Sequence, residues 1–276
     1  MRAESGVKDF HLPYAYDINN SNENYDGLAS WTVSGGYTTS ASLWINQYYT
    51  SASKYTSSIK AGLTGHEIGH SLGLNHASII QVLPTIMWPY TFNSDGTPSA
   101  RKLTPGTGDI SDTNSLYPTI PNFSSNVSPR ADGTYVAASW AIYYKDEKEL
   151  YEAADMVIIG KVTNENGSKF KKGDYSTYKS YADVKVKEVL KGDNSYTGKN
   201  IEISQMGGDD GSVKVIAEHS THLKHNNNVI LFLKRNSDNT YRPINEDDGI
   251  YIDKEGKGNY ANIQSDKDMN IANLPR

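Results

Sequence analysis

Short runs of β-branched and aromatic residues, bounded by Gly, Ser and Asn, recur along the chain and predict strands. In the first half such runs lie at residues 27–36 (GLASWTVSGG) and 41–46 (ASLWIN). In the second half, turn signals separate similar runs at residues 157–162, 181–190, 200–205, 228–234 and 249–253. This pattern predicts a small antiparallel sheet or barrel in the second half.

Helical spacing of apolar residues is found in a few places only. Residues 55–73 are predicted to form a helix because Ile59, Leu63 and Ile68 recur at near-helical spacing. Thr56 and the two serines after it are candidate N-caps, and Gly73 is a natural stop. Residues 104–118 predict a short helix closed by a proline, and residues 146–156 predict another.

A polar stretch rich in Pro, Ser, Asn and Gly, residues 119–134, has little to bury and is predicted to be a linker. The chain has 276 residues, which is long enough for two domains with separate cores. We therefore expect one domain at residues 1–118 and a β-rich accessory domain at residues 135–276.

The composition of the chain argues against several classes of function. The net charge is −5 with both signs mixed, so no basic footprint for nucleic acid is expected. No apolar run reaches the length of a membrane span. The chain has no cysteine, which excludes disulfides, thiolate zinc sites and cysteine nucleophiles.

The segment HEIGHSLGLNH, residues 66–76, carries the clearest chemical signal. Positions i and i+4 of a helix share one face, so His66 and His70 would aim two imidazoles at one point. Gly73 permits a tight turn that can return His76 as a third ligand. Three nitrogen ligands leave one tetrahedral position open, as in catalytic zinc sites.

Glu67 lies next to His66 and would reach a water on the same metal. Zinc acidifies such a water, and Glu67 could take its proton as a general base before passing it to a leaving amine. A surface helix with unrelated histidines is the simpler alternative, but it does not require a third histidine and a glycine at fixed offsets.

This motif resembles the zinc motif of the metzincin metallopeptidases. Downstream, PTIMWPY supplies Met87 in the place of the metzincin Met-turn, and Met-Trp-Pro together with residues 103–118 (LTPGTGDISDTNSLYP) is similar to the matrixin branch. The resemblance implies an α+β catalytic domain, with a twisted sheet, an active-site helix and a C-terminal helix. Met87 would form a hydrophobic floor without binding metal. The strand–helix–strand segment usual before the motif is not evident, so the domain is expected to be trimmed or incomplete at its N-terminus.

The resemblance also implies where a substrate would bind. Residues 26–36 resemble the matrixin edge strand, so a peptide would add antiparallel to Leu28–Val33, with Leu28 and Ala29 in contact with it. Pro89 and Tyr90 would line the pocket for the side chain after the cut bond. Plain sheet structure is the alternative for the strand residues. A thiolate latch, common among matrixins, cannot come from a chain without cysteine.

Two further groups of residues are weaker candidates for metal binding. Asp17, Glu23 and Asp26 could contribute to a calcium site, although loop carboxylates are usually only solvated. A second group of histidines, His219, His222 and His225, is interpreted as part of a solvated loop, with a metal site as the lesser alternative.

The sequence thus predicts a zinc-dependent metalloendopeptidase that binds one Zn²⁺ and acts on proteins or peptides, with Ca²⁺ as the lesser candidate for a second ion. The alternative is a zinc-binding, catalytically silent protein whose C-terminal β module mediates binding. A structural zinc site would need a fourth protein ligand, and none is evident near the motif. We expect secretion, although residues 1–14 contain no signal peptide. The sequence does not determine the oligomeric state.

Overall fold

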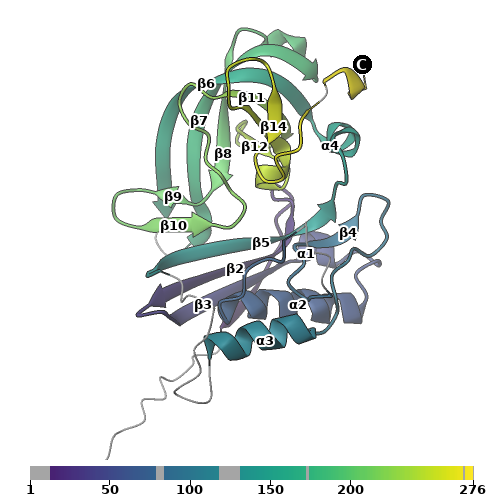
Figure 1. Ribbon diagram of the computed structural model, residues 1–276, viewed down its shortest axis with the longest axis vertical. Helices are drawn as coiled ribbons and strands as arrows, with labels where there is room; N and C mark the ends of the chain where they lie inside the picture. The colour runs from purple at the N-terminus through teal and green to yellow at the C-terminus, as the bar shows by residue number, and fades with distance from the viewer. Residues whose placement is uncertain (1–12, 79–83, 118–130, 172–173, 270, 276) are drawn as a thin grey trace, which may run out of the picture.

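The computed structural model describes residues 13–78, 84–117, 131–171, 174–269 and 271–275 of the chain. The fold is α+β, as expected, with two mixed β-sheets and few helices. Helices cover one face of the first sheet, here sheet A, and the second sheet, here sheet B, lies over its other face (Figure 1).

Sheet A contains strands from distant parts of the chain. Its order is β1–β3–β2–β5–β10–β9, and β4 also pairs with β5. The strands are β1 (Tyr14–Ile18), β2 (Tyr25–Ser34), β3 (Tyr37–Asn46), β4 (Tyr90–Asn93), β5 (Gly133–Tyr143), β9 (Gly208–Asp209) and β10 (Lys214–Ala217). The sheet therefore takes strands from both sides of the expected linker; the division into domains itself stays a prediction.

The β2–β3 hairpin follows directly from local sequence. Ser34 pairs with Tyr37, and the two residues between them, Gly35 and Gly36, have φ of 60° and 81°. A two-residue turn with both φ values positive matches the twist of the flanking strands, and glycine adopts it without strain.

The expectation that residues 28–33 form an edge strand is wrong. β2 pairs antiparallel with β3 on one side and antiparallel with β5 on the other. Leu28 lies opposite Ala138, and Ala29 lies opposite Ala137. The strand looked like an edge because its second partner comes from more than 100 residues downstream, and local sequence carries no sign of that pairing.

Helices α2, α3 and α4 lie at the expected positions, whereas α1 was not expected. α2 (Ser57–Ser71) and α3 (Thr107–Leu116) lie against sheet A on the side away from sheet B (Figure 1). α4 (Glu147–Ala153) follows β5, and α1 (Gln47–Thr50) is a single turn after β3. Among the described residues, none of the helices has both the length and the apolar character needed to cross a bilayer.

Sheet B forms a nearly closed ring. Its order is β12–β8–β7–β6–β11–β13–β14, and β12 also pairs with β11. The strands are β6 (Met156–Lys171), β7 (Asp174–Lys191), β8 (Asn200–Met206), β11 (Asn228–Arg235), β12 (Tyr241–Pro243), β13 (Ile250–Asp253) and β14 (Tyr260–Asn262). The expected sheet was purely antiparallel, but β12 and β8 are parallel, so sheet B is mixed. Short 3-10 turns lie at Asn194–Tyr196, Glu246–Gly249 and Ile271–Asn273.

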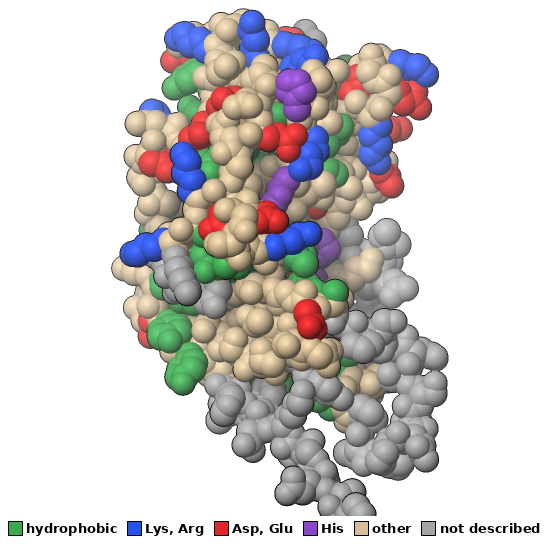
Figure 2. All heavy atoms as spheres, turned by 90° about the vertical axis from the view of Figure 1, so that its left-hand side faces the viewer, with side chains coloured by type: hydrophobic (Ala, Val, Ile, Leu, Met, Phe, Trp, Pro, Cys, Tyr) green, Lys and Arg blue, Asp and Glu red, His purple; other side chains and the backbone are tan. Residues whose placement is uncertain are grey.

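The two sheets share an apolar layer. Leu28, Val136 and Trp140 of sheet A pack in one cluster with Tyr178 and Met206 of sheet B. Burial of this apolar surface holds the two halves of the chain together. On the face in Figure 2, acidic and basic side chains are interspersed over sheet B, which fits the expectation of no basic footprint there.

Candidate metal centre

Helix α2 presents two of the motif histidines. Thr56 caps its start, because its side chain accepts a hydrogen bond from the backbone N–H of Ile59. His66 and His70 lie one turn apart near the other end, and both are completely buried. Nδ1 of His66 lies 2.8 Å from the carbonyl oxygen of Ile86, and Nδ1 of His70 lies 2.9 Å from that of Leu74.

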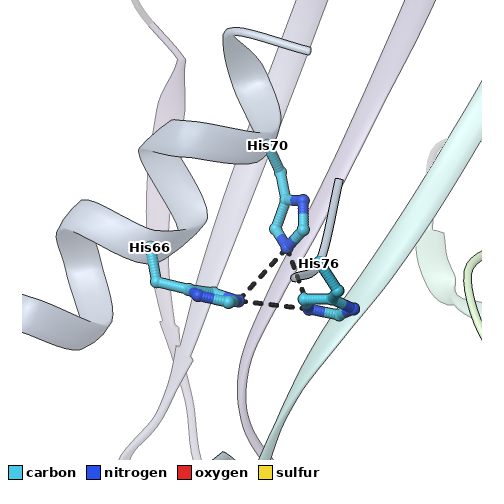
Figure 3. A group of neighbouring side chains, drawn as sticks. All are labelled: His66, His70 and His76. Carbon is cyan, nitrogen blue, oxygen red and sulfur yellow. Dashed lines mark hydrogen bonds between the residues drawn. The ribbon is translucent and has the colours of Figure 1, made fainter. Parts of the chain in front are cut away.

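A glycine turn returns the third histidine. Gly73 has a φ of 89°, and the backbone N–H of Leu74 donates to the carbonyl of Gly69 at 3.0 Å. This is the left-handed helix ending that glycine favours. The chain then doubles back, and His76 faces the two helical histidines (Figure 3).

The three Nε2 atoms form a nearly equilateral triangle. The distances are 3.2 Å from His66 to His70, 3.2 Å from His66 to His76 and 3.1 Å from His70 to His76 (Figure 3). Ligands about 2.0–2.1 Å from a tetrahedral zinc ion lie about 3.3–3.4 Å apart. The spacing of the nitrogens therefore fits a single zinc ion bound by all three.

The proton positions strengthen this fit. A carbonyl oxygen can only accept, so Nδ1 of His66 and of His70 must carry the proton, and each Nε2 is left with a lone pair. Two lone pairs cannot hydrogen-bond to each other, so the short contact between these rings is not an ordinary hydrogen bond. A cation at their meeting point removes the repulsion, and backbone carbonyls at Nδ1 are the usual outer partners of metal-bound histidines.

Burial favours the neutral form of His66 and His76. Burial lowers the pKa of His66 well below its ordinary value, and the charges of Arg101 and His70 lower it further. Burial also lowers the pKa of His76, with His70 and His66 acting in the same direction. Neutral imidazole is the form that binds metal, so the site is prepared for an ion rather than for a proton.

Glu67 follows His66 on α2 and is completely buried. Neither of its carboxylate oxygens has a hydrogen-bond partner among the described residues. Burial raises its pKa well above the ordinary value, and the charges of Asp26 and Glu218 raise it further, whereas Arg101 lowers it. The carboxylate packs so closely against β2 that a Cβ placed on Gly27 would lie 2.2 Å from Oε1.

Met87 is buried and packs directly under α2. A Cβ on Gly69 would lie 2.4 Å from its sulfur, and a Cβ on Gly65 would lie 2.8 Å from Cδ1 of Ile86. These two glycines, one turn apart, let the segment that contains Met87 approach the helix closely. The backbone carbonyl of Met87 also accepts a hydrogen bond from the N–H of Ala77, next to the third histidine.

Aromatic rings connect the site to sheet A. Trp31 of β2 stacks on His70 with ring centroids 5.4 Å apart, and Tyr135 of β5 stacks on Trp31 at 5.7 Å. The imidazole of His70 is therefore held from the sheet side by a ring and at Nδ1 by the carbonyl of Leu74, just after the helix. Sequence reasoning missed both aromatic residues as neighbours of the site.

The second half of the chain also reaches the site, which the sequence did not reveal. A carboxylate oxygen of Glu218 lies 3.2 Å from Nδ1 of His76, and the His219 ring stacks on His76 at 5.4 Å. His76, Glu218 and His219 form a second group that could hold a metal ion. The expectation of a solvated loop is thus wrong for His219, which is half-buried against a motif histidine.

Polar residues outside the motif join β2, β5 and the Met87 segment. Buried Arg101 donates to the carbonyl of Trp88 at 2.7 Å and to Oγ of Ser139 at 2.6 Å. Ser139 donates in turn to Asp26 at 2.8 Å, and Asp26 also accepts from Tyr55 at 2.7 Å. No motif in the sequence marks this network, because its members are distant in the chain and ordinary in type.

Other segments of the chain cover the residues that were expected to bind substrate. Leu28 and Ala29 are buried beside β5, as their register with Ala138 and Ala137 requires. The carbonyl of Pro89 accepts a hydrogen bond from the N–H of Trp140 at 2.8 Å.

The side chain of Tyr90 is also hydrogen-bonded to another part of the chain. Its hydroxyl donates to Asp248, with distances of 2.9 and 3.0 Å to the two carboxylate oxygens. Burial raises the pKa of Asp248 to about 7.

The remaining candidate ligands are not brought together. Among the described residues, Asp17, Glu23 and Asp26 form no group that could hold a metal, and Glu23 pairs instead with Lys179. His222 and His225 each contact a backbone carbonyl, of Met206 at 2.8 Å and of Thr163 at 2.9 Å.

Comparison with known proteins gives no relative from which a function could be transferred. No protein-family model matches the chain, and no curated protein matches it either. The functional argument therefore depends on the geometry of the histidine group.

Proposed function

We propose that the protein is a zinc-dependent metalloendopeptidase that resembles the matrixins of the metzincin clan. His66, His70 and His76 would hold the zinc ion, and Glu67 would act as the general base. Protein or peptide chains would be its substrates, and we expect it to act outside the cell.

One observation carries the proposal: three Nε2 atoms converge at 3.1–3.2 Å from one another. Two of the rings are fixed by backbone carbonyls at Nδ1, so the convergence does not depend on flexible side chains. The contact between His66 and His70 sets two lone pairs against each other, and a bound cation would make it favourable.

Zinc bound here would supply a Lewis acid that polarises a peptide carbonyl and acidifies water. Glu67 would accept the proton that the attacking water loses and deliver it to the nitrogen of the departing amine as the C–N bond breaks. A buried carboxylate without a hydrogen-bond partner is costly, and the costs of such groups are commonly accepted at functional sites. Met87 would support the ligand-bearing helix from below.

In a conformation in which β5 has left β2, the substrate would lie along β2, with Leu28 and Ala29 beside it and Pro89 and Tyr90 beside the residue after the cut bond. Strand addition supplies affinity through backbone hydrogen bonds and needs no particular side chains. This part of the proposal rests on the matrixin resemblance.

A catalytically silent zinc protein is the second candidate, and one observation favours it. His66, Glu67 and His70 are completely buried, and the side chain of His76 is only 1% exposed. In this conformation no peptide could reach the site, so activity requires a rearrangement of the chain.

Zinc content and peptide hydrolysis together separate the two candidates. The purified full-length chain is loaded with zinc, its metal is counted by mass spectrometry, and hydrolysis of a quenched peptide library is followed with and without a chelator. Glu67→Gln should retain one equivalent of zinc and lose hydrolysis at least about 100-fold, which is typical for removal of a general base. Glu188→Gln, at an exposed position of β7, is the matched control.

His70→Ala should lose the zinc as well as the activity. Hydrolysis that neither the chelator nor Glu67→Gln abolishes would contradict the proposal. One equivalent of bound zinc without hydrolysis, under any activating treatment, would instead support the silent zinc protein.

A further inference from the structure

We propose that β5 is a built-in occupant of the substrate groove, so that the protein as described is latent and hydrolysis requires β5 to leave β2. This inference rests on the proposed function, because it concerns the regulation of the same site. It assigns to residues 133–143 the role that a thiolate latch cannot fill in a chain without cysteine.

β5 lies where a peptide substrate is expected. It runs antiparallel to β2, with register pairs from Val33–Gly133 to Tyr25–Trp140. On its other side it is parallel to β4, and the N–H of Trp140 donates to the carbonyl of Pro89. β5 thus contacts the two chain segments that were predicted, from sequence, to border a bound peptide.

β5 is also linked to the metal centre through Glu218. The carbonyl of Val136 accepts a hydrogen bond from the N–H of Glu218 at 2.9 Å, and the Glu218 carboxylate lies 3.2 Å from His76. Figure 3 shows this strand passing beside His76. A peptide that approached the histidines along β2 would therefore follow the path that β5 takes.

Hydrogen bonds and ring stacking hold β5 against β2 and its neighbours. Ser139 is bonded to Asp26 and Arg101, and Tyr135 stacks on Trp31, which stacks on His70. Ala137 and Ser139 of β5 are completely buried. Departure of β5 would uncover the backbone of β2 and would carry the Glu218–His219 end of β10 away from His76.

An engineered crosslink tests this directly, because the chain offers no competing thiol. Thr32 of β2 and Thr134 of β5 are register partners whose hydroxyl oxygens lie 3.4 Å apart. The double variant Thr32→Cys/Thr134→Cys should form a disulfide that ties β5 to β2 and opens again with a phosphine reductant. Lys185→Cys/Asn200→Cys, a register pair of β7 and β8 in sheet B, is the matched crosslink control.

Two readouts are taken on the full, zinc-loaded chain in oxidised and reduced form. The first is hydrolysis of the quenched peptide library. The second does not need catalysis. A labelled synthetic peptide of residues 133–143 is added to the same double variant carrying Glu67→Ala, and its binding is followed by fluorescence anisotropy. A peptide with proline in place of Val136 and Ala138, which cannot complete the strand pairing, is the control ligand.

We expect the reduced protein to bind the strand peptide and to hydrolyse the library. In the oxidised protein, peptide affinity and hydrolysis rate should each fall at least about tenfold. The sheet B crosslink control should show no such change. Equal hydrolysis before and after reduction would overturn the inference, since β5 would not need to leave. Equal peptide binding by the two forms, or none by either, would overturn it as well.

If neither form hydrolyses peptides although zinc is bound, the proposed protease function fails. The inference is then decided by anisotropy alone: binding restricted to the reduced form supports occupation of the groove by β5. The failure of one proposal is therefore distinguishable from the failure of the other.

Discussion

Glu67 is the residue whose environment is least typical of a protein interior. A buried carboxylate usually has several hydrogen-bond donors, because desolvation of the charge is otherwise costly. Glu67 has none among the described residues, and its nearest constraint is steric, from Gly27 of β2. The absence of a side chain at position 27 is what allows the carboxylate to lie where it does.

Gly27→Ala should therefore destabilise the protein by about 1–3 kcal/mol, the usual cost of overpacking a buried site. The added methyl group would meet both Oε1 of Glu67 and Cδ1 of Leu63. In the double variant Gly27→Ala/Glu67→Ala most of this loss should disappear. The measurement is the free energy of unfolding by urea, analysed as a double-mutant cycle.

Gly108→Ala is the control, because nothing lies within 4 Å of a Cβ at that position. It should leave the free energy of unfolding within about 0.5 kcal/mol of the wild type. If the two substitutions at positions 27 and 67 are additive, the carboxylate does not occupy the place described for it.

At the scale of elements, α2 begins at a capping threonine and is followed by a glycine turn. Near its end it carries two histidines whose Nδ1 atoms contact backbone carbonyls. Its glycines at positions 65 and 69 weaken the helix intrinsically, yet they permit the close approach of Ile86 and Met87. The helix therefore depends on its cap and on tertiary packing more than on propensity.

Thr56→Ala should cost about 1 kcal/mol of stability, because the backbone N–H of Ile59 loses its acceptor. Thr56→Ser keeps the oxygen and should restore nearly all of that loss. Both are compared by chemical unfolding of the zinc-free protein, so that metal binding does not mask the effect. Equal stability of the alanine and serine variants would show that the cap does not support the helix.

At the scale of the whole molecule, buried acidic residues of the Glu246–Gly249 turn connect distant segments of the second half of the chain. Glu246 accepts from the backbone N–H of Met206 and from Ser220, and Asp247 accepts from Thr221. Burial and, to a lesser extent, the charge of Asp247 raise the pKa of Glu246 to about 8, although the Ser220 hydrogen bond and the Lys179 charge act in the opposite direction.

The folded protein therefore holds a proton on Glu246 that the unfolded chain releases near its ordinary pKa of 4.5. Stability from this group is present below about pH 4.5 and is lost as the pH rises toward 8. Glu246→Gln mimics the protonated form and should gain melting temperature relative to the wild type between pH 5 and 8. A change of 1 kcal/mol corresponds to roughly 2–4 °C in a chain of this size.

The difference between variant and wild type isolates Glu246 from the other buried groups that titrate in this range. Glu188→Gln, at an exposed position, should show no such pH-dependent difference. Parallel melting curves for Glu246→Gln and the wild type across this range would contradict the raised pKa.

The sequence by itself determined the local features. Two histidines one turn apart, a cap at Thr56 and a glycine after the helix are sufficient to predict α2 and the convergence of His66, His70 and His76, because each contact involves residues fewer than about twelve positions apart. The β2–β3 hairpin and the short helices were predictable for the same reason.

Only the tertiary structure decided what surrounds that group. The pairing of β2 with β5, the contact of Glu218 with His76 and the bond from Tyr90 to Asp248 join residues more than 100 positions apart. A strand pattern states which face is buried but not which of several strands will pair with it. Whether the metal centre lies open or covered therefore depends on packing between the halves, which no local motif encodes.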